Sequence, residues 1–208
     1  MPALLELQDI TCSRGERQLF SGLSARLGPS QWLRVQGNNG AGKTSLLRMV
    51  CGLLLPTRGA VLWRGEPITR LREEFSRELL YLGHAAALKN DLSAIENLQC
   101  ASALGGHMPG TDAAAAALEA AGLGAQLDLP ARVLSQGQRR RVALARLALP
   151  EAASLWVLDE PFNALDTTAC AWLTGLLNRH LKRGGLAVLT SHQSVALDAA
   201  LPPLVLAL

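Results

Sequence analysis

Hydrophobic and polar residues alternate at the start of the chain. The stretch Leu4–Ile10 alternates with a period of two, which predicts a half-exposed β-strand, and residues 19–27 are expected to continue it as an antiparallel edge. The pattern then changes. Gln31–Gln36 predicts a further strand, and Ser45–Leu54 places its hydrophobic residues on one face of a helix. With the glycine-rich loop between them, these two segments form a βα unit.

Alanine and leucine dominate the middle of the chain, from about residue 85 to residue 148, between short polar and glycine-containing breaks. Ala113–Ala121 predicts a helix, because alanine is the strongest helix former. Continuous hydrophobic runs return at residues 155–158 and 186–189, and they are typical of parallel strands buried on both faces. We therefore expect one α/β domain over residues 1–208, with a mixed sheet, an antiparallel edge and an α-helical insertion.

Composition excludes some classes of function. The 208 residues suit one folded domain, and no run approaches the roughly 20 consecutive apolar residues of a membrane-spanning helix. A net charge of +3 is too small to favour nucleic acid as a partner. The first residues lack the features of a secretory signal, which predicts a cytoplasmic chain. The four cysteines show no metal-ligand spacing and are expected to be reduced and buried.

The stretch Gly37–Thr44 matches G-x-x-x-x-G-K-[ST] and lies between a predicted strand and a predicted helix, which is the context that a phosphate-binding loop requires. Backbone N–H groups of such a loop point at phosphate oxygens, and the following helix adds its positive end. Lys43 is expected to bridge the β- and γ-phosphates of ATP, and Thr44 to bind Mg²⁺. A chance glycine-rich turn is the alternative. The residues expected to bind nucleotide here are Gly37, Asn38, Asn39, Gly40, Ala41, Gly42, Lys43, Thr44 and Ser45.

Two carboxylates, Asp159 and Glu160, follow the hydrophobic run 155–158 directly. Ligands of open α/β sheets bind at the carboxyl ends of the strands, so we expect this acidic pair to face the phosphate loop. Asp159 suits the Mg²⁺ shell, and Glu160 suits the general base that activates water for attack on the γ-phosphate. The alternative is a solvated turn before Pro161.

The segment Val133–Pro150, "VLSQGQRRRVALARLALP", has two interpretations. It resembles a basic amphipathic helix for nucleic acid or an anionic membrane. Its start, however, has Ser135 three residues before Gln138, which is a capping-box pattern. A helix that starts there presents free N–H groups and a positive dipole end, which together form an anion site.

Together with Lys43 and the acidic pair, this start resembles the signature of the ATP-binding subunits of ABC transporters. The family usually has L-S-G-G-Q, and here Gln136 stands in place of the first glycine. Asn163–Asp166 resembles the loop that follows the family's acidic pair, and Ser191-His192 resembles its switch histidine. These motifs occur in the family's order over nearly the whole chain.

The resemblance implies an ATPase that uses Mg²⁺, with Lys43, Glu160 and His192 in catalysis. It also implies a head-to-tail dimer, in which the signature of one copy faces the γ-phosphate held by the other. The signature residues expected at that phosphate are Ser135, Gly137 and Gln138. Arg139–Arg141 then become the first turns of the signature helix, partly solvated, and the nucleic-acid interpretation loses its support.

At two positions the chain differs from the usual family pattern, and these differences indicate a particular subfamily. His84 stands where a glutamine usually senses Mg²⁺ and the membrane partner, and Arg14 is the nearest candidate to replace the aromatic residue that stacks on adenine. Both residues also have an ordinary structural explanation. With these features the chain is most similar to the ATP-binding subunits of haem exporters in cytochrome c maturation.

This subfamily resemblance implies a peripheral subunit that docks on integral membrane subunits at the cytoplasmic face of the inner membrane. It implies that hydrolysis is linked to the release of haem from a periplasmic haem chaperone. Three alternatives remain: a transporter subunit for a different cargo, a soluble cassette ATPase of DNA repair or translation, and a P-loop kinase with a small acceptor. The signature helix and His192 argue against the kinase.

Overall fold

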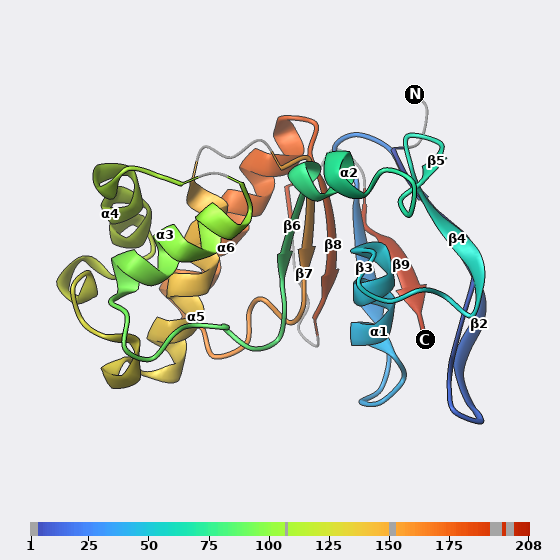
Figure 1. Ribbon diagram of the computed structural model, residues 1–208, viewed down its shortest axis with the longest axis horizontal. Coiled ribbons are helices and arrows are strands. Elements are labelled where there is room, and N and C mark those ends of the chain that lie inside the picture. The colour runs from blue at the N-terminus through green and yellow to red at the C-terminus, as the bar shows by residue number, and fades with distance from the viewer. Residues whose placement is uncertain (1–3, 107, 150–152, 192–196, 199–201) are drawn as a thin grey trace. The chain divides into compact units, whose positions relative to one another are not determined.

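The computed structural model describes residues 4–106, 108–149, 153–191, 197–198 and 202–208 (Figure 1). The chain divides into two compact units. Unit 1 comprises Met1–Tyr81, Ala153–Glu160 and Asn178–Leu208, and unit 2 comprises Leu82–Ala152 and Pro161–Leu177. The helical insertion expected over residues 85–148 lies within unit 2, which also takes in part of the chain after the acidic pair.

The first sheet of unit 1 is antiparallel and has the strand order β2-β1-β4-β5. Its strands are β1 (Leu5–Arg14), β2 (Arg17–Leu27), β4 (Arg58–Trp63) and β5 (Glu66–Pro67). β1 and β2 pair antiparallel, as expected from the alternating pattern, and they belong to a sheet that is separate from the parallel one. Leu5 and Leu7 are buried and Glu6 between them is half-buried, as a period of two requires.

The second sheet of unit 1 has the order β6-β7-β8-β3-β9. Its strands are β6 (Leu79–Leu82), β7 (Leu155–Leu158), β8 (Leu186–Thr190), β3 (Trp32–Gln36) and β9 (Leu204–Ala207). The pairs β7/β8, β8/β3 and β3/β9 are parallel, and every residue of β7 and β8 is buried. Figure 1 shows β7, β8 and β3 side by side. Their carboxyl ends therefore meet at one edge of the sheet, where the chemistry-bearing residues follow.

Helices α1 (Lys43–Val50) and α2 (Arg72–Glu78) complete this part of unit 1. The sequence predicted a helix over Ser45–Leu54, and the real α1 starts two residues earlier and ends four residues earlier. It ends because Gly52 takes a left-handed φ of 71°, which breaks the helical path. Leu53, Leu54 and Leu55 are consequently exposed instead of packing on the helix face.

Unit 2 is helical, with α3 (Ala94–Leu104), α4 (Thr111–Ala120), α5 (Gln136–Ala145) and the first part of α6 (Thr167–Lys182). Short 3-10 turns lie at Gly124–Gln126, Ala131–Val133 and Arg146–Ala148. Its core consists of small and aliphatic residues, and the predicted alanine helix is α4. Over the part of the chain that the structure describes, no helix is both long and apolar enough to cross a bilayer.

A buried histidine near the end of α6 packs against β7. The ring of His180 stacks on Trp156, with 3.8 Å between the ring centroids and 7° between the planes. His180 Nε2 lies 3.0 Å from the carbonyl oxygen of Leu186, which can only accept, so Nε2 carries the proton. Burial, helped by the charge of Arg183, lowers the pKa of His180 from 6.5 to about 4.

This histidine makes the stability of the fold depend on pH. Between pH 6.5 and 4 the unfolded chain binds a proton at residue 180 and the folded chain does not, so we expect stability to fall by about 1.4 kcal/mol per pH unit from this group. The total loss is about 3 kcal/mol, complete below pH 4 and absent above pH 6.5. His180→Phe keeps a ring against Trp156 and should remove this part of the pH dependence. Denaturant unfolding at several pH values measures it, and an equally steep loss in the variant would contradict the assignment.

Candidate active site

The phosphate loop, Gly37–Thr44, connects the carboxyl end of β3 to the start of α1. Gly40 and Gly42 have φ values of 81° and 104°, a left-handed backbone that glycine adopts without strain. A side chain at Gly42 would also lie 2.9 Å from an atom of the Phe20 ring. These glycines therefore let the loop curl directly into the positive end of α1, whose first turn has no acidic residue.

Lys43 is the first residue of α1, and its side chain lies over the loop. Its Nζ donates to the carbonyl oxygens of Gly37, at 2.7 Å, and Asn38, at 3.3 Å. The ammonium group is therefore held above the concave side of the loop. A bound phosphate group would meet this cation together with the backbone N–H groups of the loop.

Asp159 follows β7 and is almost fully buried, at 2% exposure. Thr44 Oγ1 donates to its Oδ2 at 2.8 Å, and Thr190 Oγ1 donates to its Oδ1 at 2.8 Å. A carboxylate and a hydroxyl in direct contact are the hard oxygen ligands that Mg²⁺ prefers, and Mg²⁺ is commonly held by one or two carboxylates plus substrate phosphates. These residues fit the ion, even though the described residues contain no group of three or more acidic, histidine or cysteine side chains for an all-protein site.

Glu160 is 7% exposed and has a φ of 48°, which is uncommon for a residue other than glycine. Its backbone N–H donates to Thr190 Oγ1 at 2.7 Å. The sequence suggested a solvated turn as the alternative for the acidic pair, but both residues are buried. Strained backbone of this kind is concentrated at functional sites.

Two residues near the acidic pair were missed by the sequence analysis. Thr190 was overlooked because it directly follows the hydrophobic run 186–189; a polar residue directly before Ser191-His192 was the available signal. Tyr81, at the carboxyl end of β6, was not considered. Burial raises the pKa of the Tyr81 hydroxyl, and the charge of Asp159 raises it further. Tyr81 is therefore a neutral neighbour of Asp159 at physiological pH.

In unit 2 the signature, Leu134–Gln138, forms the predicted start of a helix. Ser135 is the N-cap of α5, with Gln138 N–H donating to Ser135 Oγ at 3.2 Å and Ser135 N–H donating to Gln138 Oε1 at 2.8 Å. The first turn of α5 has no acidic residue. The exposed start of α5 therefore presents a positive helix end to an anion.

The structure explains why a glutamine is tolerated at position 136 and a glycine is needed at 137. A side chain on Gly137 would place its Cβ 2.7 Å from the carbonyl oxygen of Ala164, closer than real contacts allow. Gln136, by contrast, is exposed. The close packing of the signature helix on the loop at Asn163–Asp166 thus requires glycine at position 137 and not at position 136.

We expect Gly137→Ala to reduce ATP hydrolysis by about 10-fold or more, because the start of α5 must move away from Ala164 and small misplacements of reacting groups are costly. ATP binding at the phosphate loop should be unchanged. Gln136→Ala alters the neighbouring exposed position and serves as the matched control. Steady-state hydrolysis rates test this, and normal turnover in Gly137→Ala would contradict the close contact.

Of the three arginines after the signature, Arg139 and Arg141 are half-buried, in agreement with a partly solvated cluster, whereas the burial of Arg140 corrects the expectation for that residue. Arg140 is 5% exposed, and its Nη1 donates to the carbonyl oxygens of Gly83 and His84 at 2.8 and 3.3 Å. Arg139 donates to Ala131 O, and Arg141 donates to the carbonyl oxygens at the end of α4. The cluster therefore holds backbone segments of unit 2 around α5.

The remaining predicted site residues lie in different surroundings. His84 is exposed just beyond β6, on the segment held by Arg140. Arg14 is exposed at the end of β1. Burial raises the pKa of the nearby Cys12 thiol, and the charge of Arg14 and a hydrogen bond with Ser45 offset part of that rise. Arg14 therefore lies near the first turn of α1. His192 lies outside the described residues.

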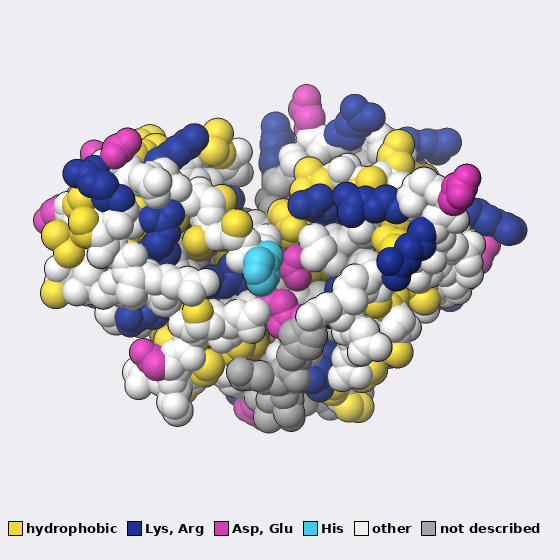
Figure 2. All heavy atoms as spheres, turned by 90° about the horizontal axis from the view of Figure 1, so that it is seen from below, with side chains coloured by type: hydrophobic (Ala, Val, Ile, Leu, Met, Phe, Trp, Pro, Cys, Tyr) yellow, Lys and Arg dark blue, Asp and Glu magenta, His cyan; other side chains and the backbone are white. Residues whose placement is uncertain are grey.

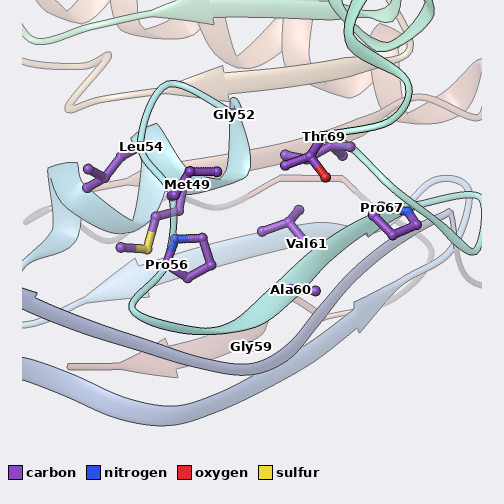
Figure 3. A pocket seen from close by; sticks show the side chains of 11 residues that line it. Met49, Gly52, Leu54, Pro56, Gly59, Ala60, Val61, Pro67 and Thr69 are labelled. Carbon is purple, nitrogen blue, oxygen red and sulfur yellow. The ribbon is translucent and has the colours of Figure 1, made fainter.

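A pocket of about 220 Å³ lies elsewhere in unit 1 (Figure 3). It is formed by the segment after α1 and by β4 and β5, and Figure 3 shows Met49, Pro56 and Val61 around it. No titratable side chain lines it, so it carries no acid–base chemistry. It also lies at the carboxyl end of α1, whereas the phosphate loop precedes the amino end.

The basic side chains on the face drawn in Figure 2 do not form a single continuous stripe. Lys and Arg side chains lie there in separate clusters, among hydrophobic and uncharged ones. This distribution agrees with the small net charge of +3.

Comparison with known proteins identifies relatives over nearly the whole chain. Residues 20–163 match the ABC transporter family. The chain is 53% identical over 203 residues to the cytochrome c biogenesis ATP-binding export protein CcmA of Aromatoleum aromaticum, covering 98% of this chain and 94% of that protein. It is 50% identical over 196 residues to the protein of the same name from Dechloromonas aromatica, covering 94% and 96%.

Solved structures share the fold at lower identity. The ATP-binding cassette MJ0796, determined as a dimer in a post-hydrolysis state with ADP and Pi, has a TM-score of 0.77 and 23% identity, covering 91% of this chain and 88% of that one. An ATP-binding subunit of an ABC transporter has a TM-score of 0.79 and 23% identity, covering 91% and 79%.

Proposed function

Because this chain belongs to the ABC transporter family, we propose that it is the ATP-hydrolysing subunit of a haem exporter that serves cytochrome c maturation. The observation that carries the hydrolytic role is the phosphate loop with Thr44 hydrogen-bonded to Asp159 and Glu160 beside it. The role in cytochrome c biogenesis rests on the likeness to the export proteins over nearly their whole length. We further propose that hydrolysis is linked to the release of haem from a periplasmic haem chaperone.

Within this function each residue of the site has a distinct task. Lys43 and the loop N–H groups bind the β- and γ-phosphates, and Thr44 and Asp159 hold Mg²⁺. When bound, Mg²⁺ offsets the charge of the phosphate oxygens. Glu160 accepts the proton of the attacking water, as its burial next to Asp159 suits a positioned base. Three further roles rest on the family resemblance: His192 contacts the γ-phosphate, His84 is a sensing residue and Arg14 contacts adenine.

We propose that two copies join head to tail, so that Ser135, Gly137 and Gln138 of one copy approach the γ-phosphate bound by the other. The exposed, capped start of α5 supports this. Its positive helix end can bind an anion, and no acidic side chain in its first turn competes for that place. The dimeric state of the structurally similar cassette MJ0796 agrees with it.

Ser135→Arg tests the composite site. A large cation at the exposed cap should prevent the two copies from closing on ATP, so hydrolysis should fall by about 100-fold or more, while the isolated chain still binds ATP normally. Equilibrium nucleotide binding and steady-state hydrolysis measure the two effects. An equal loss of both would place Ser135 at its own chain's nucleotide instead.

The transport role predicts attachment to the cytoplasmic face of the inner membrane through integral membrane subunits. After co-expression with candidate membrane subunits, we expect the chain in the membrane fraction, and we expect it in the soluble fraction without them. Recovery in the soluble fraction under both conditions would favour a soluble cassette ATPase. With the assembled complex, ATP-dependent release of haem from the loaded chaperone distinguishes haem export from another cargo.

A further inference from the structure

Thr190 is a polar residue at the end of an otherwise apolar strand. It is the last residue of β8 and is fully buried, at 0% exposure. In the parallel register, Leu189 pairs with Leu158 of β7, directly before the acidic pair, and Thr190 pairs with Val35 of β3, two residues before the phosphate loop begins. Thr190 therefore lies between the two strand ends that supply the site.

Its single hydroxyl group contacts both acidic residues. Thr190 Oγ1 donates its one hydrogen to Asp159 Oδ1 at 2.8 Å and accepts the backbone N–H of Glu160 at 2.7 Å. Thr44 Oγ1 donates to the other oxygen of Asp159 at 2.8 Å. The two oxygens of Asp159 are thus held by hydroxyl groups from two different elements.

The second of these bonds acts on a strained position. Glu160 has a φ of 48°, and a non-glycine residue keeps such a conformation only where its surroundings hold it. The hydrogen bond from Glu160 N–H to Thr190 is a direct restraint on that peptide group. Without it, the backbone can relax and carry the Glu160 carboxylate away from its buried place next to Asp159.

We propose that Thr190 is a positioning residue for ATP hydrolysis, which fixes Asp159 and Glu160 relative to each other and to the phosphate loop. It acts through these two residues. The inference rests on the proposed roles of Asp159 and Glu160. It goes beyond them because it assigns the positioning of both residues to the Thr190 hydroxyl group on β8.

The test uses three substitutions at position 190. Thr190→Val keeps the shape and removes both hydrogen bonds, Thr190→Cys keeps the volume with only a weak donor and acceptor, and Thr190→Ser keeps the hydroxyl. Ser102→Ala removes another fully buried hydroxyl, at 0% exposure in α3, and is the matched control for loss of stability. For each, kcat, KM for ATP, nucleotide affinity and melting temperature are measured in the full chain.

We expect Thr190→Val to lower kcat by about 10-fold or more and to change KM and ATP affinity by less than about threefold. Thr190→Ser should retain at least about half of the wild-type kcat, and Thr190→Cys should fall between the two. Ser102→Ala should keep its kcat whatever its melting temperature. A serine variant that fails as badly as valine, or a valine variant with normal kcat, would overturn the proposal.

Hydrogen exchange supplies a readout that does not depend on turnover. In the nucleotide-free chain, the amide of Glu160 should exchange faster in Thr190→Val than in the wild type or Thr190→Ser. Unchanged exchange would overturn the restraint. If the valine variant does not fold, the cysteine variant decides by both readouts. If the proposed function is wrong, the wild-type chain itself will hydrolyse no ATP. The hydrogen-exchange result does not depend on hydrolysis and still tests the restraint by Thr190.

Discussion

Glu160→Gln is expected to reduce ATP hydrolysis by on the order of 100-fold or more while ATP remains bound. Glutamine keeps the shape and hydrogen-bonding capacity of this buried side chain but cannot accept the proton of the attacking water. The backbone N–H that bonds to Thr190 is unaffected, so the local fold should persist. Because ATP is held and not consumed, the variant should run as an ATP-dependent dimer on a sizing column.

Glu78 offers a matched control for this change. It is a glutamate of unit 1 whose carboxylate accepts hydrogen bonds from Arg64 and from Ser154 Oγ. Glu78→Gln should lower the melting temperature and keep the hydrolysis rate. Near-normal turnover in Glu160→Gln would transfer the base role to another residue, and a monomer in the presence of ATP would contradict the dimer mechanism.

Lys43→Ala is expected to weaken ATP binding by about 100-fold or more, because it removes a charge-assisted contact to the phosphates. In the free chain this ammonium donates to carbonyl oxygens of Gly37 and Asn38. More Mg²⁺ should not restore affinity, since an ion held at the proposed site, Thr44 and Asp159, would not replace the lysine. Calorimetric titration with ATP at two Mg²⁺ concentrations measures the loss.

Arg72 is the first residue of another helix of unit 1, α2, and is exposed. Arg72→Ala therefore removes a cation without changing α1 or the loop, and it should bind ATP like the wild type. If Lys43→Ala also bound ATP normally, the phosphate-loop assignment would be wrong. Melting temperatures of both variants show whether the loop carbonyls need the lysine for folding.

Local sequence was sufficient wherever a short stretch carries its own physical constraint. The glycines of Gly37–Thr44, the period of two in β1 and the capping box at Ser135 each depend on neighbours within a few residues, and the structure has all three. The same holds for the buried runs that became β7 and β8. The end of α1 was predicted wrongly, since the helix stops at Val50, before Gly52 takes a left-handed conformation.

The contacts between distant segments were beyond the sequence. The sequence determined an α/β fold, the phosphate loop, the acidic pair and the signature, because these are written in local patterns. Only the tertiary structure decided that Thr190 holds both acidic residues, that Gly137 must admit the carbonyl of Ala164, and that Arg140 is buried against the segment at His84. Each of these contacts joins residues far apart in the chain, and its geometry is set by strand register and helix packing, which no local pattern of residues specifies.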